Sequence, residues 1–570
     1  MRDQQDAQEK GLATDGSTMT PNTDDTASSI IQDVPISDNP TFHTTKTSID
    51  SHEIEYRYLT FQSDIPLTPI FPPDFKGQVP PCPNLRDYED PFTWSLTRKR
   101  LMTYLSCSVN ITASYSAGSY SSPEYILSEK WGVSRVAYNV GITIFTLGFG
   151  LAPMVLAPFS EINGRRPVFI ATGFLFVICQ LSCALTDSYA GMLLARFFLG
   201  VGGSTFATMV GGILADVWET AERNTAMALF TGATMLGTGL GPLVSGFVAQ
   251  RLLWRWVFWI QVITSGTMVS LVAIFFKETR GSIILSHKAK ILNKWYKKLE
   301  DAGALGMQVD ETDPEKTTLH NACRIRWKVQ TDEDRSSLGK MIAVSLYRPF
   351  HMLFTEPVVF WFSLWVAFSW AVLYIQFGSI PLVFEANHGF TLEQTGAVFA
   401  AVCSGGVIAT FLSILQEKWA VRRYPVKING SPEGRLLFSC IESPLMPIGL
   451  FWFGWTCYSS IHWIVPTLAL GVATMGIFSI YLATFNYIAD VYHVYASSAL
   501  AANGLCRNLL GGFFPLVTVQ MFDGLGFQAA SSLLGGIGAV LTLVPWILAL
   551  YGPKIRARSK IASSFTPPGS

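Results

Sequence analysis

Arg196 is the only charged residue in an apolar run from about 190 to 214, where it opens the segment RFFLGVGG. A cation inside a hydrocarbon layer is costly, so by default such a residue faces the interior of a helix bundle and serves a function. The chemistry open to it is proton transfer, which needs a titrating partner. The first apolar run offers Asn110 and no acid, so the proton carrier stays unnamed. The alternative is a side chain that extends from the outer half of its helix to the membrane surface.

A short polar turn, PFSEINGRRP, joins two apolar runs at residues 158–167. Gly164 should allow the tight turn because it has no side chain. Glu161, Arg165 and Arg166 would lie at the cytosolic surface, where the arginines could pair with acids at other helix ends. The alternative is an ordinary inner loop, since such loops carry arginines in any membrane protein.

A charge-free, glycine-rich stretch occupies residues 232–246 and reads GATMLGTGLGPLVSG. Missing side chains let a neighbouring helix approach closely and slide. Pro242 should bend the helix because it removes a backbone donor. The glycines form two sets, one repeating every seven residues and one separated by a single turn: Gly232, Gly239 and Gly246, then Gly237 and Gly241. The alternative is a packing face without a role in motion.

The composition indicates an all-α membrane protein. The 570 residues are 49% hydrophobic and 14% charged, with a mean hydropathy of +0.32, whereas soluble domains carry about a quarter charged residues. We expect about 12 spanning helices in two sets of six, which indicates the internal repeat of transporters. The expected spans are 101–121, 138–158, 167–186, 190–214, 225–248, 255–277, 356–384, 394–415, 436–457, 462–487, 496–520 and 528–551.

The polar and apolar segments divide the chain into a disordered cytosolic tail (1–98), an N-terminal six-helix bundle (99–277), a cytosolic central loop (278–354), a C-terminal six-helix bundle (355–552) and a cytosolic C-terminal tail (553–570). The first tail is rich in Ser, Thr, Asp and Pro, which is typical of disorder. The central loop opens with HKAKILNKWYKK, which predicts an amphipathic helix along the inner membrane face and then a flexible linker. Positive-inside topology already explains these lysines, so no nucleic acid is expected as a partner.

The distribution of Lys and Arg places both termini in the cytosol, together with the turn at Arg165. The sequon at Asn429 would then face the cytosol and carry no glycan. Most of the nine cysteines lie in apolar runs, unlike a secreted disulfide framework. The sequence shows no nucleotide-binding loop, metal cluster or Ser/His/Asp set, so we expect neither an enzyme nor a cofactor or metal.

These motifs resemble signatures of the major facilitator superfamily. The order Gly-x-x-x-Gly-Pro-x-x-Ser-Gly at 237–246 resembles the fifth-helix signature of its twelve-spanner drug:proton antiporters. The 158–167 turn resembles the inner loop of fungal multidrug members, and Arg196-Phe-Phe-Leu-Gly200 resembles the fourth-helix motif. Further segments extend the resemblance to the fungal polyamine and multidrug branch over about 90–557: 254–259, 277–280, 348–357, 432–436, 487–490 and 497–516.

The resemblance implies the fold of that superfamily and roles for these motifs. The 158–167 turn would latch the inner gate, Arg196 would take part in proton transfer, and the glycine signature is linked to antiport. The second-half counterpart of the turn, 416–435, is degenerate. By contrast, Gly511-Gly512-Phe-Phe-Pro515 echoes Gly241-Pro242, as a two-fold repeat predicts.

The resemblance also assigns the substrate cavity to the first and fourth helices of each half. Aromatic rings with sparse polar groups suit planar or lipophilic molecules, and the scarcity of acids counts against polyamines. Packing or an interfacial belt is the alternative role for each Trp and Tyr. The candidate residues are Asn110, Ser114, Tyr115, Trp361, Trp365, Tyr374, Gln376, Tyr481, Asn486 and Tyr487.

We therefore expect a secondary active transporter, a proton-coupled antiporter that exports small organic molecules such as secondary metabolites, toxins or drugs by alternating access. A facilitative or proton-coupled importer is one alternative, although sugar porters usually follow the sixth span with Pro-Glu-Ser-Pro-Arg and this chain has Lys277-Glu278-Thr279-Arg280. A transport-dead membrane sensor is another. The expected partners are a small-molecule substrate, protons and the lipid bilayer, and the expected state is a monomer. The plasma membrane is the first expectation, with the vacuolar and peroxisomal membranes as alternatives.

Overall fold

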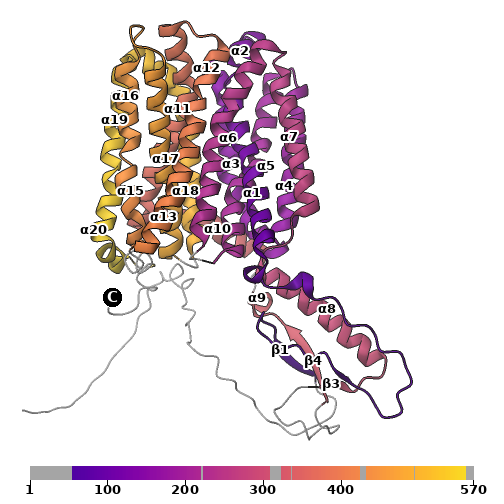
Figure 1. Cartoon of the computed structure of the whole chain (residues 1–570). Coiled ribbons are helices and arrows are strands. Elements are labelled where there is room, and N and C mark those ends of the chain that lie inside the picture. Colours follow the sequence, from indigo (N-terminus) through magenta and orange to yellow (C-terminus); the bar gives the residue numbers. More distant parts are fainter. Residues whose placement is uncertain are drawn as a thin grey trace, which may run out of the picture. The chain divides into compact units, whose positions relative to one another are not determined.

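The computed structural model describes residues 54–219, 222–308, 322–334, 337–423, 432–492, 495–559 and 561. Figure 1 shows two groups of long helices side by side. The first group contains α1 (Leu96–Ser119), α2 (Glu124–Trp131), α3 (Arg135–Asn163), α4 (Arg165–Leu185), α5 (Tyr189–Val217), α6 (Arg223–Arg251) and α7 (Arg255–Phe275). The second contains α10 (Leu338–Thr355), α11 (Pro357–His388), α12 (Leu392–Val398), α13 (Ala400–Arg423), α15 (Leu436–Glu442), α16 (Leu445–Thr456), α17 (Ile464–Tyr492), α18 (Ala496–Leu525), α19 (Phe527–Leu541) and α20 (Leu543–Arg558).

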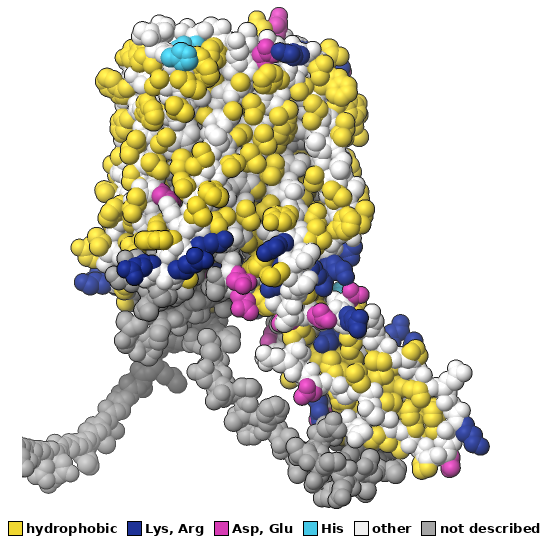
Figure 2. All heavy atoms as spheres, viewed as in Figure 1, with side chains coloured by type: hydrophobic (Ala, Val, Ile, Leu, Met, Phe, Trp, Pro, Cys, Tyr) yellow, Lys and Arg dark blue, Asp and Glu magenta, His cyan; other side chains and the backbone are white. Residues whose placement is uncertain are grey.

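The spanning helices agree with the expected number once α1 is included. Within the described residues, 11 helical stretches are long and apolar enough to cross a bilayer, and pairs such as α12–α13 and α19–α20 each form one stretch. α1 is 24 residues long and packs against α6, but its serines, threonines and basic first turn lower its hydropathy. Figure 2 shows hydrophobic side chains over the flank of the bundle and Lys and Arg gathered at its lower margin.

Serine side chains begin three of these helices. The side-chain oxygens of Ser95, Ser134 and Ser188 each accept a backbone N–H from the first turn of α1, α3 and α5. Such caps satisfy donors that the start of a helix leaves free, which matters where water is scarce.

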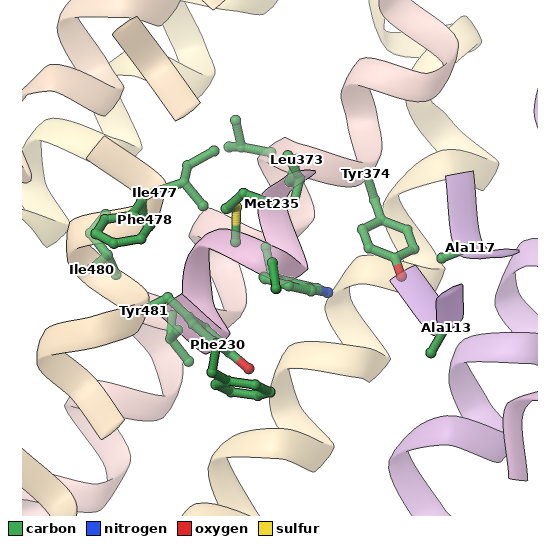
Figure 3. Close-up of a cluster of buried hydrophobic side chains, with 14 of the residues drawn as sticks. Ala113, Ala117, Phe230, Met235, Leu373, Tyr374, Ile477, Phe478, Ile480 and Tyr481 are labelled. Atoms are coloured by element: carbon green, nitrogen blue, oxygen red, sulfur yellow. The ribbon is translucent and has the colours of Figure 1, made fainter. Parts of the chain in front are cut away.

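Helices α6 and α18 carry much of the packing between the halves. α6 packs against α1 in its own half and against α12, α13 and α17 in the other, while α18 packs against α11 and against α3. Figure 3 shows the buried cluster where α6, α11 and α17 meet. In this cluster the ring of Phe230 lies 6.5 Å from that of Tyr481. The core is therefore continuous across the two halves.

A small α/β unit differs from the expected tail and central loop. Its sheet has the order β1-β4-β3-β2, formed by β1 (Ile54–Tyr58), β2 (Pro69–Ile70), β3 (Gly306–Gln308) and β4 (Ala322–Lys328). The other elements here are η1 (Arg86–Tyr88), η2 (Pro91–Thr93), α8 (Gly281–Asp301) and α9 (Gln330–Glu333). Leu292 and Tyr296 of α8 are buried against Ile325 and Trp327 of β4.

The expectation of disorder throughout 1–98 is therefore wrong for residues 54–98, and the expected membrane-surface helix is instead a helix packed on a sheet. The physical reason is that its apolar face finds a protein partner assembled from both segments, because β1 pairs in parallel with β4. Residues 1–53, 309–321 and the sequon at Asn429 lie outside the described residues.

Candidate functional site

Gly164 and Glu278 organise the turn between α3 and α4. Gly164 has a φ of 96°, a left-handed conformation that glycine adopts without strain. The carboxylate of Glu278, after α7, accepts the backbone N–H groups of Arg165 at 2.9 Å and Arg166 at 3.0 Å. An anion at a helix N-terminus is stabilised by these free donors and by the helix dipole. A Cβ at position 164 would collide with this carboxylate.

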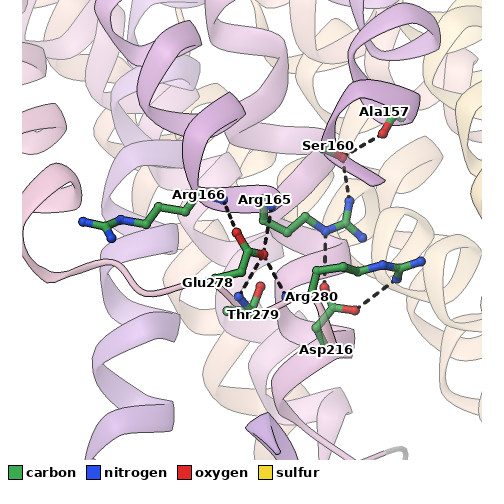
Figure 4. Close-up of polar contacts among 8 residues, drawn as sticks. All are labelled: Ala157, Ser160, Arg165, Arg166, Asp216, Glu278, Thr279 and Arg280. Carbon is green, nitrogen blue, oxygen red and sulfur yellow. Dashed lines mark hydrogen bonds and ion pairs between the residues drawn. The ribbon is translucent and has the colours of Figure 1, made fainter. Parts of the chain in front are cut away.

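The side chain of Arg165 joins the turn to α5, as Figure 4 shows. Its Nε donates to Asp216 Oδ2 at 3.2 Å and its Nη1 donates to Ser160 Oγ at 3.0 Å. Arg280 pairs with the other oxygen of Asp216 at 3.4 Å. One carboxylate thus binds two guanidinium groups from different segments of the N-terminal half.

The other two predicted residues of the turn lie at its edge. Arg166 is exposed, and its guanidinium donates to the carbonyl of Ala273 at 3.1 Å. Glu161 is half-buried in the last turn of α3. The contacts of Arg165 and Arg166 described above all lie within the N-terminal half. The inner-gate latch implied by the family resemblance stays a prediction.

The two ends of α6 connect the halves. At the N-terminal end of α6, Arg223 pairs with Asp490 of α17 at 3.3 Å. At the opposite end, Arg251 pairs with Glu393 of α12 at 2.6 Å. The first pair is largely buried, whereas the Arg251 side chain is 68% exposed. Both ends of the interface between the halves are therefore held by charge pairs.

The glycines of α6 face two different neighbours. A Cβ at Gly237 would lie 2.5 Å from the carbonyl oxygen of Ile111, and one at Gly241 would lie 2.7 Å from that of Tyr115, both in α1. The three glycines that recur every seven residues instead face α12 and α13 of the second half: Gly232, Gly239 and Gly246. One set brings α6 close to α1, and the other set forms the contact across the halves.

α18 repeats this arrangement in the second half. Gly511 faces α11 in its own half, while Gly512 faces α3, where Thr143 Oγ1 donates to the Gly512 carbonyl at 2.7 Å. Pro242 and Pro515 lie inside α6 and α18 respectively. Each half therefore contributes a glycine-proline helix that packs on both halves, as an internal repeat predicts.

Arg196 lies inside the N-terminal half and is only 1% exposed. Its Nε donates to the carbonyl of Gly141 at 3.2 Å and its Nη1 to that of Ser116 at 3.0 Å. Its guanidinium carbon lies 4.3 Å from the ring centroid of Tyr120 and 4.5 Å from that of Phe145. The side chain does not extend to the membrane surface, because carbonyl oxygens and aromatic faces enclose it.

A small cavity of about 20 Å³ lies between the halves. Of the predicted residues, Ser114, Tyr374 and Tyr481 line it. Trp370, which stacks on Tyr481 at 5.2 Å, also lines it, as does Arg507. Sequence reasoning did not assign Arg507 to the cavity, although a lone cation in the apolar run 496–520 is the same signal that selected residue 196.

Four other predicted cavity residues lie outside its lining. Asn110 is fully buried and its Nδ2 donates to Thr234 Oγ1, a lining residue, at 2.7 Å. Gln376 and Trp365 are buried in α11, and Tyr115 is half-buried in α1. These four residues therefore do not line the cavity, and Asn110 reaches it only through its bond to Thr234.

The remaining three candidates lie away from the cavity. Asn486 and Tyr487 are near the C-terminal end of α17, where Asn486 donates to Asn224 of α6 and Tyr487 donates to Glu433 at 3.3 Å. Trp361 is 49% exposed and lines a separate groove of about 440 Å³ formed with α19 and α20. The prediction for Trp361 therefore differs from the structure, because this residue lies in the second turn of α11, beside that groove.

A pocket of about 260 Å³ lies between the halves, at the end where Arg251 pairs with Glu393 of α12. Glu124, Arg135 and Glu385 contribute charged groups to its lining. Burial raises the pKa of Glu124 to about 7, with Arg135 opposing the rise and Glu385 adding to it. Glu124 Oε1 is buried and lacks a hydrogen-bond partner among the described residues. The pocket thus holds a carboxyl group that titrates near neutral pH.

Known proteins similar to this chain are transporters of one family. Residues 104–515 match the description Major Facilitator Superfamily. The MFS-type transporter paaT of Penicillium rubens is 33% identical, over 84% of this chain and 83% of its own length. The citrinin biosynthesis cluster MFS transporter mrr1 of Monascus ruber is 32% identical, over 84% of this chain and 91% of its own. Efflux pump FUB11 of Gibberella moniliformis is 31% identical, over 81% and 74%.

Solved structures give the same architecture. The proton:xylose symporter XylE aligns with a TM-score of 0.55 at 14% identity, covering 80% of this chain and 97% of that structure. At such low identity the likeness concerns the fold alone. It confirms the predicted all-α membrane fold with two halves.

Proposed function

Because this chain belongs to the Major Facilitator Superfamily, we propose that it is a proton-coupled antiporter that exports small organic molecules by alternating access. Secondary metabolites, toxins and drugs are the proposed substrates, since similar fungal proteins are named as an efflux pump and as a transporter of a biosynthesis cluster. The proposed location is the plasma membrane, across which export removes a compound from the cell. The proposed state is a monomer, because one chain supplies both halves.

The observation that carries this proposal is the cavity of about 20 Å³ between the halves, together with the two charge pairs that join the halves at either end. We refer to it as the central cavity. The pair Arg223–Asp490 joins the halves on the cytosolic side, and Arg251–Glu393 joins them on the other. Releasing one pair while the other holds would expose the cavity to one side of the membrane. Rocking of two halves about a central site is the motion that alternating access requires.

Glu124 and Glu385 provide the proposed entry point for the proton. Two carboxylates share this pocket with a single cation, Arg135, so protonation of one carboxylate would remove the excess negative charge that closure must bury. Protonation from the outside would therefore favour closure of this pocket and opening of the cytosolic side. Arg196 and the turn at Arg165 are proposed to couple that change to the rest of the N-terminal half.

The proton gradient supplies enough energy for uphill export. Each unit charge that moves down 100 mV yields about 2.3 kcal/mol, which corresponds to roughly a forty-fold concentration ratio, since about 1.4 kcal/mol is tenfold. Expression in a host without its own pumps should lower the accumulation of a lipophilic toxic compound. A protonophore should abolish that effect while ATP is held constant. An equal fall with and without protonophore would exclude proton coupling, and increased accumulation would favour import.

A further inference from the structure

We propose that Arg507 forms an anion-binding subsite in the central cavity, and that the exported compounds carry a carboxylate or similar delocalised anion on a flat, apolar body. This inference rests on the proposed export function and narrows its substrate class. It assigns a binding role to a residue of α18, a helix outside the four from which the cavity residues were predicted.

Arg507 is buried but lacks the partners that a buried cation needs. It is 2% exposed, and its Nε and Nη1 are buried without a hydrogen-bond partner among the described residues. Its guanidinium carbon lies 4.5 Å from the ring centroid of Trp370 and 4.9 Å from that of Tyr481. These ring faces offset part of the desolvation cost, but a buried charge without a counterion still carries an uncompensated desolvation penalty. An anion that enters the cavity would recover that energy.

The second buried arginine, Arg196, has more partners, and only its Nη2 is buried without one among the described residues. Arg196 donates from two nitrogens to the backbone carbonyls of Gly141 and Ser116. It lies outside the cavity lining, whereas Arg507 is part of that lining. Two guanidinium nitrogens of Arg196 thus find acceptors in the protein, whereas Nε and Nη1 of Arg507 find none among the described residues.

The surroundings of Arg507 favour negative charge. Among the described residues that line the cavity, none is Asp or Glu. The acids of the neighbouring helices lie in their terminal turns, as Asp490 of α17 and Asp523 of α18 illustrate. Trp370 Nε1 is a further buried donor without an acceptor among the described residues. A site with three unused donors and no carboxylate would attract an anion and repel a cation.

The position of Arg507 in the internal repeat places it at the interface between the two halves, where alternating access requires motion. It lies eight residues before Pro515 in α18, and Thr234 lies eight residues before Pro242 in α6. Both residues line the cavity, so the two related helices both contribute to its wall. A volume of about 20 Å³ holds roughly one water molecule. The anion would therefore enter when the halves separate on the cytosolic side.

The aromatic residues define the rest of the ligand. Trp370, Tyr374 and Tyr481 line the cavity beside the guanidinium. A Cβ at Gly511 would lie 3.0 Å from Trp370, so this glycine lets α18 approach the indole closely. Fixed ring faces favour a planar, apolar group and cost little conformational entropy on binding. A carboxylate attached to an aromatic ring system meets both requirements.

The test uses the purified full-length chain and three matched probe pairs: benzoate, naphthoate and anthracene carboxylate, each with its neutral carboxamide. Equilibrium binding in detergent, without any gradient, should favour the carboxylates at least tenfold in wild type. Arg507→Met should remove this preference and leave carboxamide binding unchanged. Arg507→Lys should retain part of it, because lysine keeps the charge but loses the planar pair of donors. Arg100→Met, which removes an exposed arginine near the start of α1 and outside the cavity lining, is the matched control and should keep the preference.

Several results would overturn the subsite. The first is the absence of a carboxylate preference in wild type, and the second is a preference that persists in Arg507→Met. The third is an equal loss of carboxylate and carboxamide binding in Arg507→Met together with a lowered melting temperature. Transport in proteoliposomes separates this inference from the proposed function. A carboxylate preference in binding, together with export that ignores the proton gradient, supports the subsite and refutes the coupling. Gradient-driven export of amides and carboxylates alike refutes the subsite and supports the exporter.

Discussion

Gly241 is a position where a single added carbon would disturb the packing of α6 against the backbone of α1. A Cβ there would lie 2.7 Å from the carbonyl oxygen of Tyr115, 2.8 Å from the backbone nitrogen of Ser119 and 3.0 Å from the carbonyl carbon of Gly118. Ordinary van der Waals contact begins at 3.4 Å, so α1 and α6 would have to separate by about 0.7 Å. All three atoms belong to the backbone of α1 and cannot rotate away.

The expected cost follows from this overlap. Overpacking in a rigid core typically lowers stability by about 1–3 kcal/mol. Alanine has a higher helix propensity than glycine, which offsets about 1 kcal/mol of that loss. Gly241→Ala should therefore destabilise the closed arrangement by roughly 0–2 kcal/mol. Gly241→Leu adds three further carbons and no further propensity, so it should exceed that range. Since about 1.4 kcal/mol is tenfold, we expect an inserted protein with less than a tenth of wild-type transport.

Gly504 in α18 provides the matched control, because a Cβ added at this position would have no heavy atom within 4 Å. Gly504→Ala and Gly504→Leu should keep both the melting temperature and the transport rate. The measurements are thermal unfolding of the purified variants and protonophore-sensitive export in cells with equal surface expression. If Gly241→Leu transports as well as Gly504→Leu, the close contact of α6 with α1 has no role in the cycle.

Three further predictions concern charge and topology. Arg196→Lys should retain partial transport and Arg196→Ala almost none, because lysine keeps the charge without the two carbonyl bonds and ring contacts; normal export by the alanine variant would remove this residue from the mechanism. Burial raises the pKa of Glu124 from 4.5 to about 7, so the folded state binds the proton more tightly, and its stability should fall as pH rises from 4.5 to 7. Glu124→Gln should lose that part of the pH dependence of the melting temperature, and identical profiles would contradict the assignment. Asn429 should carry no glycan, and a glycosidase-sensitive mobility shift that disappears in Asn429→Gln would reverse the predicted orientation.

Much of the fold follows from the sequence because a bilayer permits few solutions. Long charge-free runs must satisfy their own backbone hydrogen bonds, so they form helices whose number and order are visible in the composition. The same cost explains why Arg196 faces the interior. The turn at Gly164 was predictable because only a few residues connect two spans. Motif order then indicated the superfamily, which residues 104–515 match.

Tertiary structure alone decided which neighbour each helix face meets. Trp361 and Trp365 lie one turn apart in α11, yet one is 49% exposed and the other is buried, because different helices cover α11 at the two levels. Strand β1 forms only where β4 is present to pair with it, and Ile54 lies opposite Arg324. Arg507 became a cavity residue through the packing of α18 against α11. Local sequence sets the period of a helix, but the contacts of its faces depend on partners that are distant in the chain.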